Sequence, residues 1–258
     1  MLAKYFILYL INFGKCFDHF FPYQPLVFSV LVQKYMPHLH QFLMLGLRNH
    51  EAYHVCSIAV GLVGDTARAL ESKIQPYCND YVTALLENLQ NPMLNRAVKP
   101  PVLSAFGDIA LAIGGNFEPY MQVTLMMLIQ AQATRAPDDD EELIEYVNIL
   151  REGILEAYTG IIQGLKDGNK VALLNPYAET IIGFLELLAN DPCRDEDVLK
   201  ASIGCLGDIC SALGPQVKEL ISRNFTQILV EEGMSCGDPS TVETAQWAAS
   251  IIQQIVQS

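Results

Sequence analysis

The segment 104–114, SAFGDIALAIG, decides the fold, because variants of it return along the chain. Two close variants are GLVGDTARAL at 61–70 and GCLGDICSALG at 204–214, while EAYTGIIQGL at 156–165 has Thr159-Gly160 in place of the Gly-Asp pair. Each copy has the apolar spacing of an amphipathic helix and ends near a glycine or a polar turn. A helical unit that is repeated along one chain is typical of a solenoid.

A second recurring segment begins with proline and continues into an apolar helix pattern. Four copies begin at Pro37, Pro76, Pro119 and Pro176 and have a ring-bearing residue next, whereas a fifth copy at Pro215 lacks the ring. Proline suits the first turn of a helix, because its missing N–H would have had no intrahelical acceptor there. The intervals of 39, 43, 57 and 39 residues are close to the period of HEAT or armadillo helix pairs.

The two segments together predict an all-α fold, a HEAT-repeat α-solenoid in which antiparallel helix pairs stack into a right-handed superhelix. We expect about five repeats across 37–258 and a divergent segment at 1–36, either a partial helix or sequence foreign to the repeat. The apolar run near the start is shorter than the roughly 18 to 20 residues of a membrane span. We therefore favour a soluble segment over a targeting or membrane role, and we expect no membrane insertion.

The composition limits the classes of partner. The chain has 258 residues, a formal net charge of −13 and a pI near 4.7, so it repels nucleic acid and favours basic partners. Its seven cysteines include no C-x-x-C pair, which argues against a disulfide framework and against a zinc ribbon. We expect a protein of a reducing compartment that has neither a cofactor nor a metal.

One short motif points to an enzyme instead. The residues His50, Glu51 and His54 have the H-E-x-x-H spacing by which zinc peptidases hold their metal and activate water. The motif falls at a junction between two predicted helices, and no second catalytic constellation supports it. We keep a zinc peptidase as a remote alternative and expect a protein that is not an enzyme.

Several stretches of the repeat carry a resemblance to a known family. They are, in chain order, AVGLVGDTARAL, LLENLQNP, RAVKPPVLSAFGD, SAFGDIALAIGGNF, LEAYTGIIQGLKDG and ETAQWAASIIQQ. Together they resemble the C-terminal HEAT repeats of the importin-β family of nuclear import receptors. The resemblance covers about 37–258 and leaves out residues 1 to about 35.

The resemblance implies a function as well as a fold. It implies a curved superhelix whose inner helices bind the basic segment of an importin-α-type adaptor during protein import into the nucleus. Ran GTPase and nucleoporins are expected partners of the full-length receptor, and the expected location is the cytoplasm, the nucleus and the nuclear pore. A different HEAT-repeat scaffold, which would ignore the importin-α helix, remains the alternative.

The last predicted helix, 241–256, holds the first candidate binding residues. On a helical wheel its apolar stripe includes Ala245, Ala248 and Ile252, whereas Trp247 lies away from the stripe and one turn after Glu243. An indole beside a carboxylate suits an arginine, through a cation–π contact and an ion pair. The alternative is that Trp247 covers the end of the solenoid. In the family that the chain resembles, a tryptophan at the matching position contacts the importin-α segment, which favours binding.

The repeated Gly-Asp pair supplies the other candidates. Asp65, Asp108 and Asp208 stand at the same place in their helices, so they could form an acidic ladder for a basic helix. The alternative is that each aspartate bonds to the adjacent repeat and rigidifies the stack. The glycines at 61, 64, 107, 204 and 207 are expected to allow close packing between helices.

Overall fold

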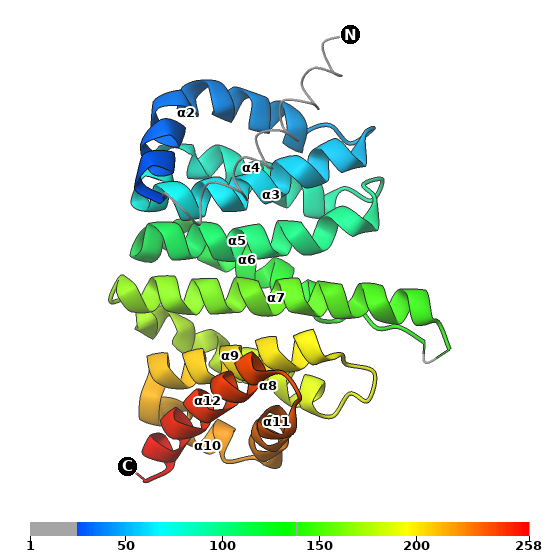
Figure 1. The fold of residues 1–258 in the computed structure, drawn as a ribbon, viewed down its shortest axis with the longest axis vertical. Coiled ribbons are helices and arrows are strands. Elements are labelled where there is room, and N and C mark those ends of the chain that lie inside the picture. Colours follow the sequence, from blue (N-terminus) through cyan, green and yellow to red (C-terminus); the bar gives the residue numbers. More distant parts are fainter. Residues whose placement is uncertain (1–24, 138, 258) are drawn as a thin grey trace.

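A computed structural model describes residues 25–137 and 139–257, and within them every regular element is helical. Residues 1–24, which make up most of the predicted divergent segment, lie outside the described residues. The all-α solenoid is confirmed, because helix after helix packs side by side along one axis (Figure 1). Within the described residues, two segments are apolar enough to cross a membrane, Arg96–Ala131 and Val171–Ala189, and both consist of helices of this stack.

The helices form two rows. We call the first row the five helices that pack on one another in chain order (Figure 1): α3 (Tyr53–Leu70), α5 (Lys99–Ile113), α7 (Glu141–Asp167), α9 (Glu196–Leu213) and α12 (Pro239–Gln257). The second row consists of α2 (Pro25–Leu47), α4 (Gln75–Gln90), α6 (Glu118–Ala131), α8 (Ala178–Ala189), α10 (Lys218–Ile221) and α11 (Asn224–Ser235). Each second-row segment precedes its first-row partner, which gives the helix pairs of a repeat.

The same turn ends three of the first-row helices. Gly114 and Gly214 follow α5 and α9 with φ of 56° and 55°, and Glu71 follows α3 with φ of 50°. Short 3₁₀ turns come next, η1 (Glu71–Ile74), η3 (Gly114–Phe117) and η5 (Gly214–Val217). Since positive φ suits glycine and strains other residues, the repeated glycine fixes the point at which the chain turns to the second row.

The prolines behave as predicted in three of five copies. Pro76 and Pro119 lie in the first two positions of α4 and α6, and Pro215 lies at the start of η5. Pro176 lies instead inside the 3₁₀ helix η4 (Val171–Tyr177). The prediction that a helix begins at Pro37 is wrong, because α2 begins at Pro25 and continues through Pro37.

A continuous apolar face explains why α2 tolerates an internal proline. Val32, Met36, Leu39, Leu43 and Leu47 recur every three or four residues on both sides of Pro37, and each is at most 2% exposed. An internal proline costs a backbone hydrogen bond and about 3 kcal/mol. Burying each large aliphatic side chain recovers about 1.5–3 kcal/mol, so five of them outweigh that loss.

Candidate partner-binding surface

The aspartates of the first two Gly-Asp pairs share one arginine. The Arg68 guanidinium donates to Asp65 on its own helix α3 and to Asp108 on α5. Burial alone would lower the pKa of Arg68, but the two carboxylates raise it overall. These three side chains line an open groove of about 460 Å³ that crosses α3, α5 and α7. The structure thus brings Asp65 and Asp108 together and neutralises much of their charge.

The third aspartate also bonds to the preceding first-row helix. Asp208 on α9 accepts a hydrogen bond of 3.0 Å from Gln163 Nε2 on α7. Burial raises the pKa of Asp208, although this hydrogen bond opposes the shift. Asp108 and Asp208 therefore each tie their helix to the one before it, which is the geometry expected of residues that rigidify the stack.

The glycines of the Gly-Asp pairs lie where the next helix packs closely, as predicted. A Cβ at Gly64 would lie 2.3 Å from Asp108 Oδ2, and a Cβ at Gly107 would lie 2.6 Å from the carbonyl oxygen of Glu156. The expectation is wrong for Gly61, which faces open space, and for Gly204, whose nearest neighbour is 3.9 Å away. Only the glycine directly before the aspartate faces the adjacent helix at close range.

Trp247 fills the equivalent place at Gly207. A Cβ there would lie 2.2 Å from Cζ3 of the indole, so one part of the ring packs against the backbone of α9. The side chain is nevertheless 39% exposed, and Glu243 is exposed one helical turn earlier. Trp247 therefore covers α9 and also presents part of its ring to solvent beside a carboxylate.

The helical wheel of the last helix needs one correction. Ala245 and Ala248 are fully buried, as predicted for the apolar stripe, but Val256, whose position on the wheel also falls on this stripe, is 48% exposed. Val256 instead lines an open pocket between α12 and the α10–α11 region. The stripe is thus buried along most of α12 and open near its end.

A second group of carboxylates was missed by the sequence analysis. Glu152 and Glu156 lie one turn apart on α7, and Asp195 and Asp197 lie at the start of α9. Burial, and then the charges of Glu156, Asp197 and Asp195, raise the pKa of Glu152. Within the part of the chain that the structure describes, none of the four carboxylates forms an ion pair.

The signal that could have found this acidic group was the fourth copy of the repeat. Glu156 opens EAYTGIIQGL, and Glu152 precedes it by four residues, so both had to share a helix face. Their meeting with Asp195 and Asp197 depends on how α7 stacks on α9, which the periodicity alone does not specify. We call Glu152, Glu156, Asp195 and Asp197 the acidic cluster.

The H-E-x-x-H motif is not assembled as a metal site. The Nε2 atom of His50 lies 2.8 Å from Asn88 Oδ1, and its Nδ1 atom lies 2.9 Å from Asn91 Nδ2. His50 precedes α3, whereas His54 lies in the first turn of α3 with its ring 3.8 Å from that of Tyr53. Among the described residues, no three His, Cys, Asp or Glu side chains are grouped to hold a metal ion.

Comparison with known proteins supplies the family. The family profile described as "Importin subunit beta-1-like, TPR repeats" matches residues 28–234, which is most of the chain. The chain belongs to the importin subunit beta-1 family. The importin subunit beta-1 of Arabidopsis thaliana is 44% identical over 226 residues, which is 86% of this chain and 26% of that protein. The chain therefore spans about a quarter of the length of this relative.

Solved structures of the same family have the same fold. A crystal structure of importin beta superposes with a TM-score of 0.84 at 39% identity, and the match covers 87% of this chain and 28% of that chain. A structure of Kap95p with RanGDP has a TM-score of 0.81 at 28% identity and matches 100% of this chain and 31% of Kap95p. The Kap95:Nup1 complex has a TM-score of 0.80 at 29% identity, with 90% and 28% covered.

Family membership decides between the enzyme and receptor predictions. Importin-β homologues are transport receptors and not enzymes, so membership of their family favours the receptor prediction over the zinc peptidase. The contacts of His50 with Asn88 and Asn91 agree with that conclusion, because they join the segment before α3 to α4 and the turn that follows it.

Proposed function

We propose that this importin-β chain binds the basic helix of an importin-α-type adaptor across α7, α9 and α12, as part of nuclear protein import. The observation that carries the proposal is the acidic cluster, a group of like charges for which the described chain supplies no counter-ion. Trp247 and Glu243 on α12 extend the same first-row surface toward the end of the solenoid.

The electrostatics of the cluster favour a cationic ligand. Like charges that lie close together destabilise one another, and partial burial increases the cost of each ionised group. The raised pKa of Glu152 reports this cost. A lysine or arginine placed among these carboxylates would remove the repulsion, so part of its binding free energy would come from relief of a penalty already present in the free protein.

Trp247 and Glu243 would bind an arginine at the end of the same ligand. The exposed part of the indole offers a ring face or edge to a guanidinium, and Glu243 is placed to pair with it. Gly207 holds the ring close to α9, which limits the positions that the indole can adopt before binding. A ring that is already positioned loses less conformational freedom when the ligand arrives.

Asp65, Asp108 and Asp208 have a different place in this proposal. Because Arg68 and Gln163 occupy their carboxylates, we infer that they support the surface by holding first-row helices together, and that the acidic cluster makes the stronger ligand contacts. Asp208 remains the candidate among the three for a direct contact, since its carboxylate accepts a hydrogen bond from a neutral amide.

Ran and nucleoporins are further proposed partners, in a longer receptor of which this chain would form one part. Support comes from the Kap95 complexes with RanGDP and with Nup1, whose importin chains share this fold over 90% or more of its length. Such a receptor would work in the cytoplasm, the nucleus and the nuclear pore.

The test is a binding titration with a labelled basic helix of the importin-α type. We expect Glu152→Gln combined with Glu156→Gln, and separately Trp247→Ala, each to weaken binding about tenfold, because each removes a contact worth roughly 1–2 kcal/mol. Glu87→Gln on α4, an exposed acid in the second row, is the control for net charge and should bind like the unmodified chain.

Two outcomes would contradict the proposal. Absence of binding by a correctly folded chain would show that these repeats do not hold a basic helix of the importin-α type. Equal binding by the unmodified chain and the three variants would show that neither the acidic cluster nor Trp247 belongs to the site. Weaker binding at higher salt is expected in addition, because ions screen the charge complementarity.

A further inference from the structure

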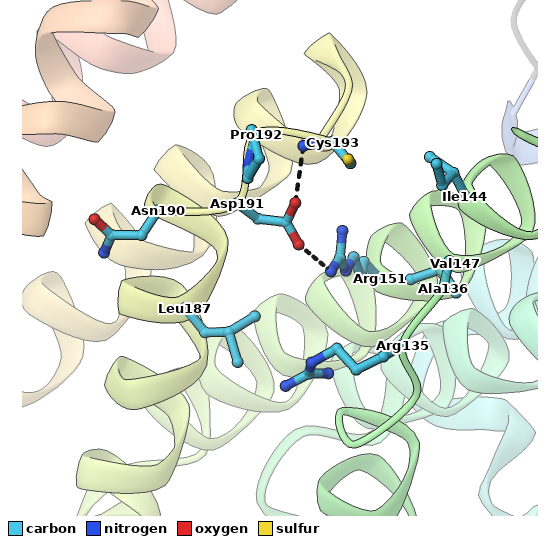
Figure 2. A pocket seen from close by; sticks show the side chains of 10 residues that line it. All are labelled: Arg135, Ala136, Ile144, Val147, Arg151, Leu187, Asn190, Asp191, Pro192 and Cys193. Carbon is cyan, nitrogen blue, oxygen red and sulfur yellow. Dashed lines mark hydrogen bonds and ion pairs between the residues drawn. The ribbon is translucent and has the colours of Figure 1, made fainter. Parts of the chain in front are cut away.

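A pocket of about 300 Å³ lies at the edge of the solenoid, away from the residues assigned above. It opens between the connection that joins α6 to α7, the first half of α7, and the connection that joins α8 to α9 (Figure 2). Its lining includes three apolar side chains, with Ile144 and Val147 on α7 and Leu187 across from them on α8 (Figure 2). It also includes two guanidinium groups, those of Arg135 and Arg151, in a chain whose net charge is −13.

Arg151 forms the buried wall of the pocket. Its side chain forms an ion pair with Asp191 and donates a hydrogen bond of 3.1 Å to Asn148 Oδ1. Its buried Nε has no hydrogen-bond partner among the described residues. Asp191 is held in turn by the backbone N–H of Cys193, at 2.8 Å from its Oδ1. Figure 2 shows Cys193, Asp191 and Arg151 connected by these contacts. Since one carboxylate faces two guanidiniums, the pocket keeps an excess positive charge.

Arg135 supplies that excess charge. Its Nη1 donates to the carbonyl oxygens of Gln132 and Thr134, at 2.5 and 2.9 Å, so the backbone of its own connection holds the guanidinium in place. It forms no ion pair with any described residue, although five of the seven arginines in the described ranges do. Figure 2 shows its guanidinium below the Arg151–Asp191 pair, directed toward Leu187. A positioned cation that has no counter-ion among the described residues and points toward an apolar side chain suits an anion that carries an apolar neighbour.

We propose that this pocket binds an acidic peptide segment of a partner protein, with a carboxylate on Arg135 and an adjacent apolar side chain against Leu187. The bidentate geometry of arginine with carboxylate fits this role. The ligand is opposite in charge to the basic helix proposed for the acidic cluster, so the two sites do not compete for one ligand type. Failure of the proposed function would therefore leave the proposal for this pocket unaffected, and the reverse also holds.

Cys193 lines the pocket and can report on it. Iodoacetate and iodoacetamide alkylate a thiol in the same way, through attack of the thiolate on the CH₂ group and loss of iodide, but only iodoacetate carries a carboxylate. Peptide mass spectrometry gives both rates at Cys193 and at Cys236, the other half-buried cysteine among the described residues, which serves as the internal reference. We expect the ratio of the iodoacetate rate to the iodoacetamide rate to be higher at Cys193.

The matched variants are Arg135→Gln and Arg48→Gln, which remove the same charge from two arginines outside any ion pair of the described chain. Arg135→Gln should lower the ratio at Cys193 about two- to fivefold, as expected for loss of one solvent-exposed charge contact. Arg48→Gln and Arg135→Lys should keep most of the rate ratio that the unmodified chain has at Cys193. An unchanged iodoacetamide rate in Arg135→Gln shows that the pocket itself has kept its shape.

Protection by a peptide tests the ligand class directly. N-acetyl-leucyl-glutamate amide at millimolar concentration should slow alkylation of Cys193 by iodoacetamide, and the glutamine analogue should not. Equal rate ratios at Cys193 in the unmodified chain and in Arg135→Gln would overturn the proposal. Equal protection by the two peptides would overturn it as well, since it would mean that the pocket does not select the carboxylate.

Discussion

Gly160→Ala is the substitution for which the structure makes the sharpest stability prediction. A Cβ at Gly160 on α7 would lie 2.3 Å from the carbonyl oxygen of Gly107 on α5, and 2.5 and 2.6 Å from its carbonyl carbon and Cα. Contacts of a Cβ below 3.0 Å essentially do not occur, so the two helices would have to separate by at least 0.7 Å. The atoms involved belong to the backbone, and no side-chain rotation can relieve the contact.

The expected magnitude follows from two opposing terms. Alanine in a helix interior is favoured over glycine by about 1 kcal/mol. Overpacking costs about 1–3 kcal/mol, and the upper end applies here because a whole helix must move. We therefore expect Gly160→Ala to lower the free energy of unfolding by about 2 kcal/mol.

The assay is urea unfolding followed by far-UV circular dichroism, with Gly183→Ala as the control. Gly183 lies in α8, and a Cβ there would meet nothing within 4 Å, so its replacement should raise stability by up to about 1 kcal/mol. The pair separates the cost of the helix contact from the effect of removing a glycine. If Gly160→Ala is as stable as the unmodified chain or more so, then α5 and α7 do not pack backbone to backbone and the reasoning fails.

The remaining predictions concern strain and charge. Glu71→Gly should raise stability by about 1 kcal/mol because Glu71 has φ of 50°, whereas Glu87→Gly in α4 should lower it by about as much; urea unfolding measures both. The folded-state pKa of Glu152 is raised, so the stability linked to its protonation is present at low pH and is lost as pH rises through that pKa. Between pH 4 and 7 the free energy of unfolding of Glu152→Gln should therefore fall less than that of the unmodified chain. Arg68→Gln should cost about 1 kcal/mol in low salt and less in high salt, with Arg48→Gln near zero, because only Arg68 separates two carboxylates.

The repeat architecture could be predicted because it depends on local pattern. The copies around 61–70, 104–114 and 204–214 carry the helix period, the close-packed glycine and, in two of the three, the glycine of the turn. Each of these is a property of a few consecutive residues. Pro37 was misread for the same reason, since a proline alone suggests a helix start and only the burial of α2 on both sides shows otherwise.

The candidate site was predicted less completely, because charge partners come from neighbouring helices. The three aspartates share a sequence position, yet Arg68 reaches two of them and Gln163 reaches the third. Arg68 stands three residues after Asp65, so that pair could have been anticipated from helix spacing, whereas its bond to Asp108 on α5 could not. Glu152 gains its unusual environment from α9, which lies more than forty residues away in sequence.

The contact between α5 and α7 has a mechanical consequence for the solenoid. At Gly107 and Gly160 the two backbones touch, and Gly153 and Gly164 continue the close approach along α7. Between α7 and α9 the helices are joined by side chains instead, through Gln163 with Asp208 and Lys166 with Ser211. Side chains can change rotamer under load and a backbone contact cannot, so if the superhelix bends, we expect α5 and α7 to turn as one stiff block and the α7–α9 joint to act as a hinge.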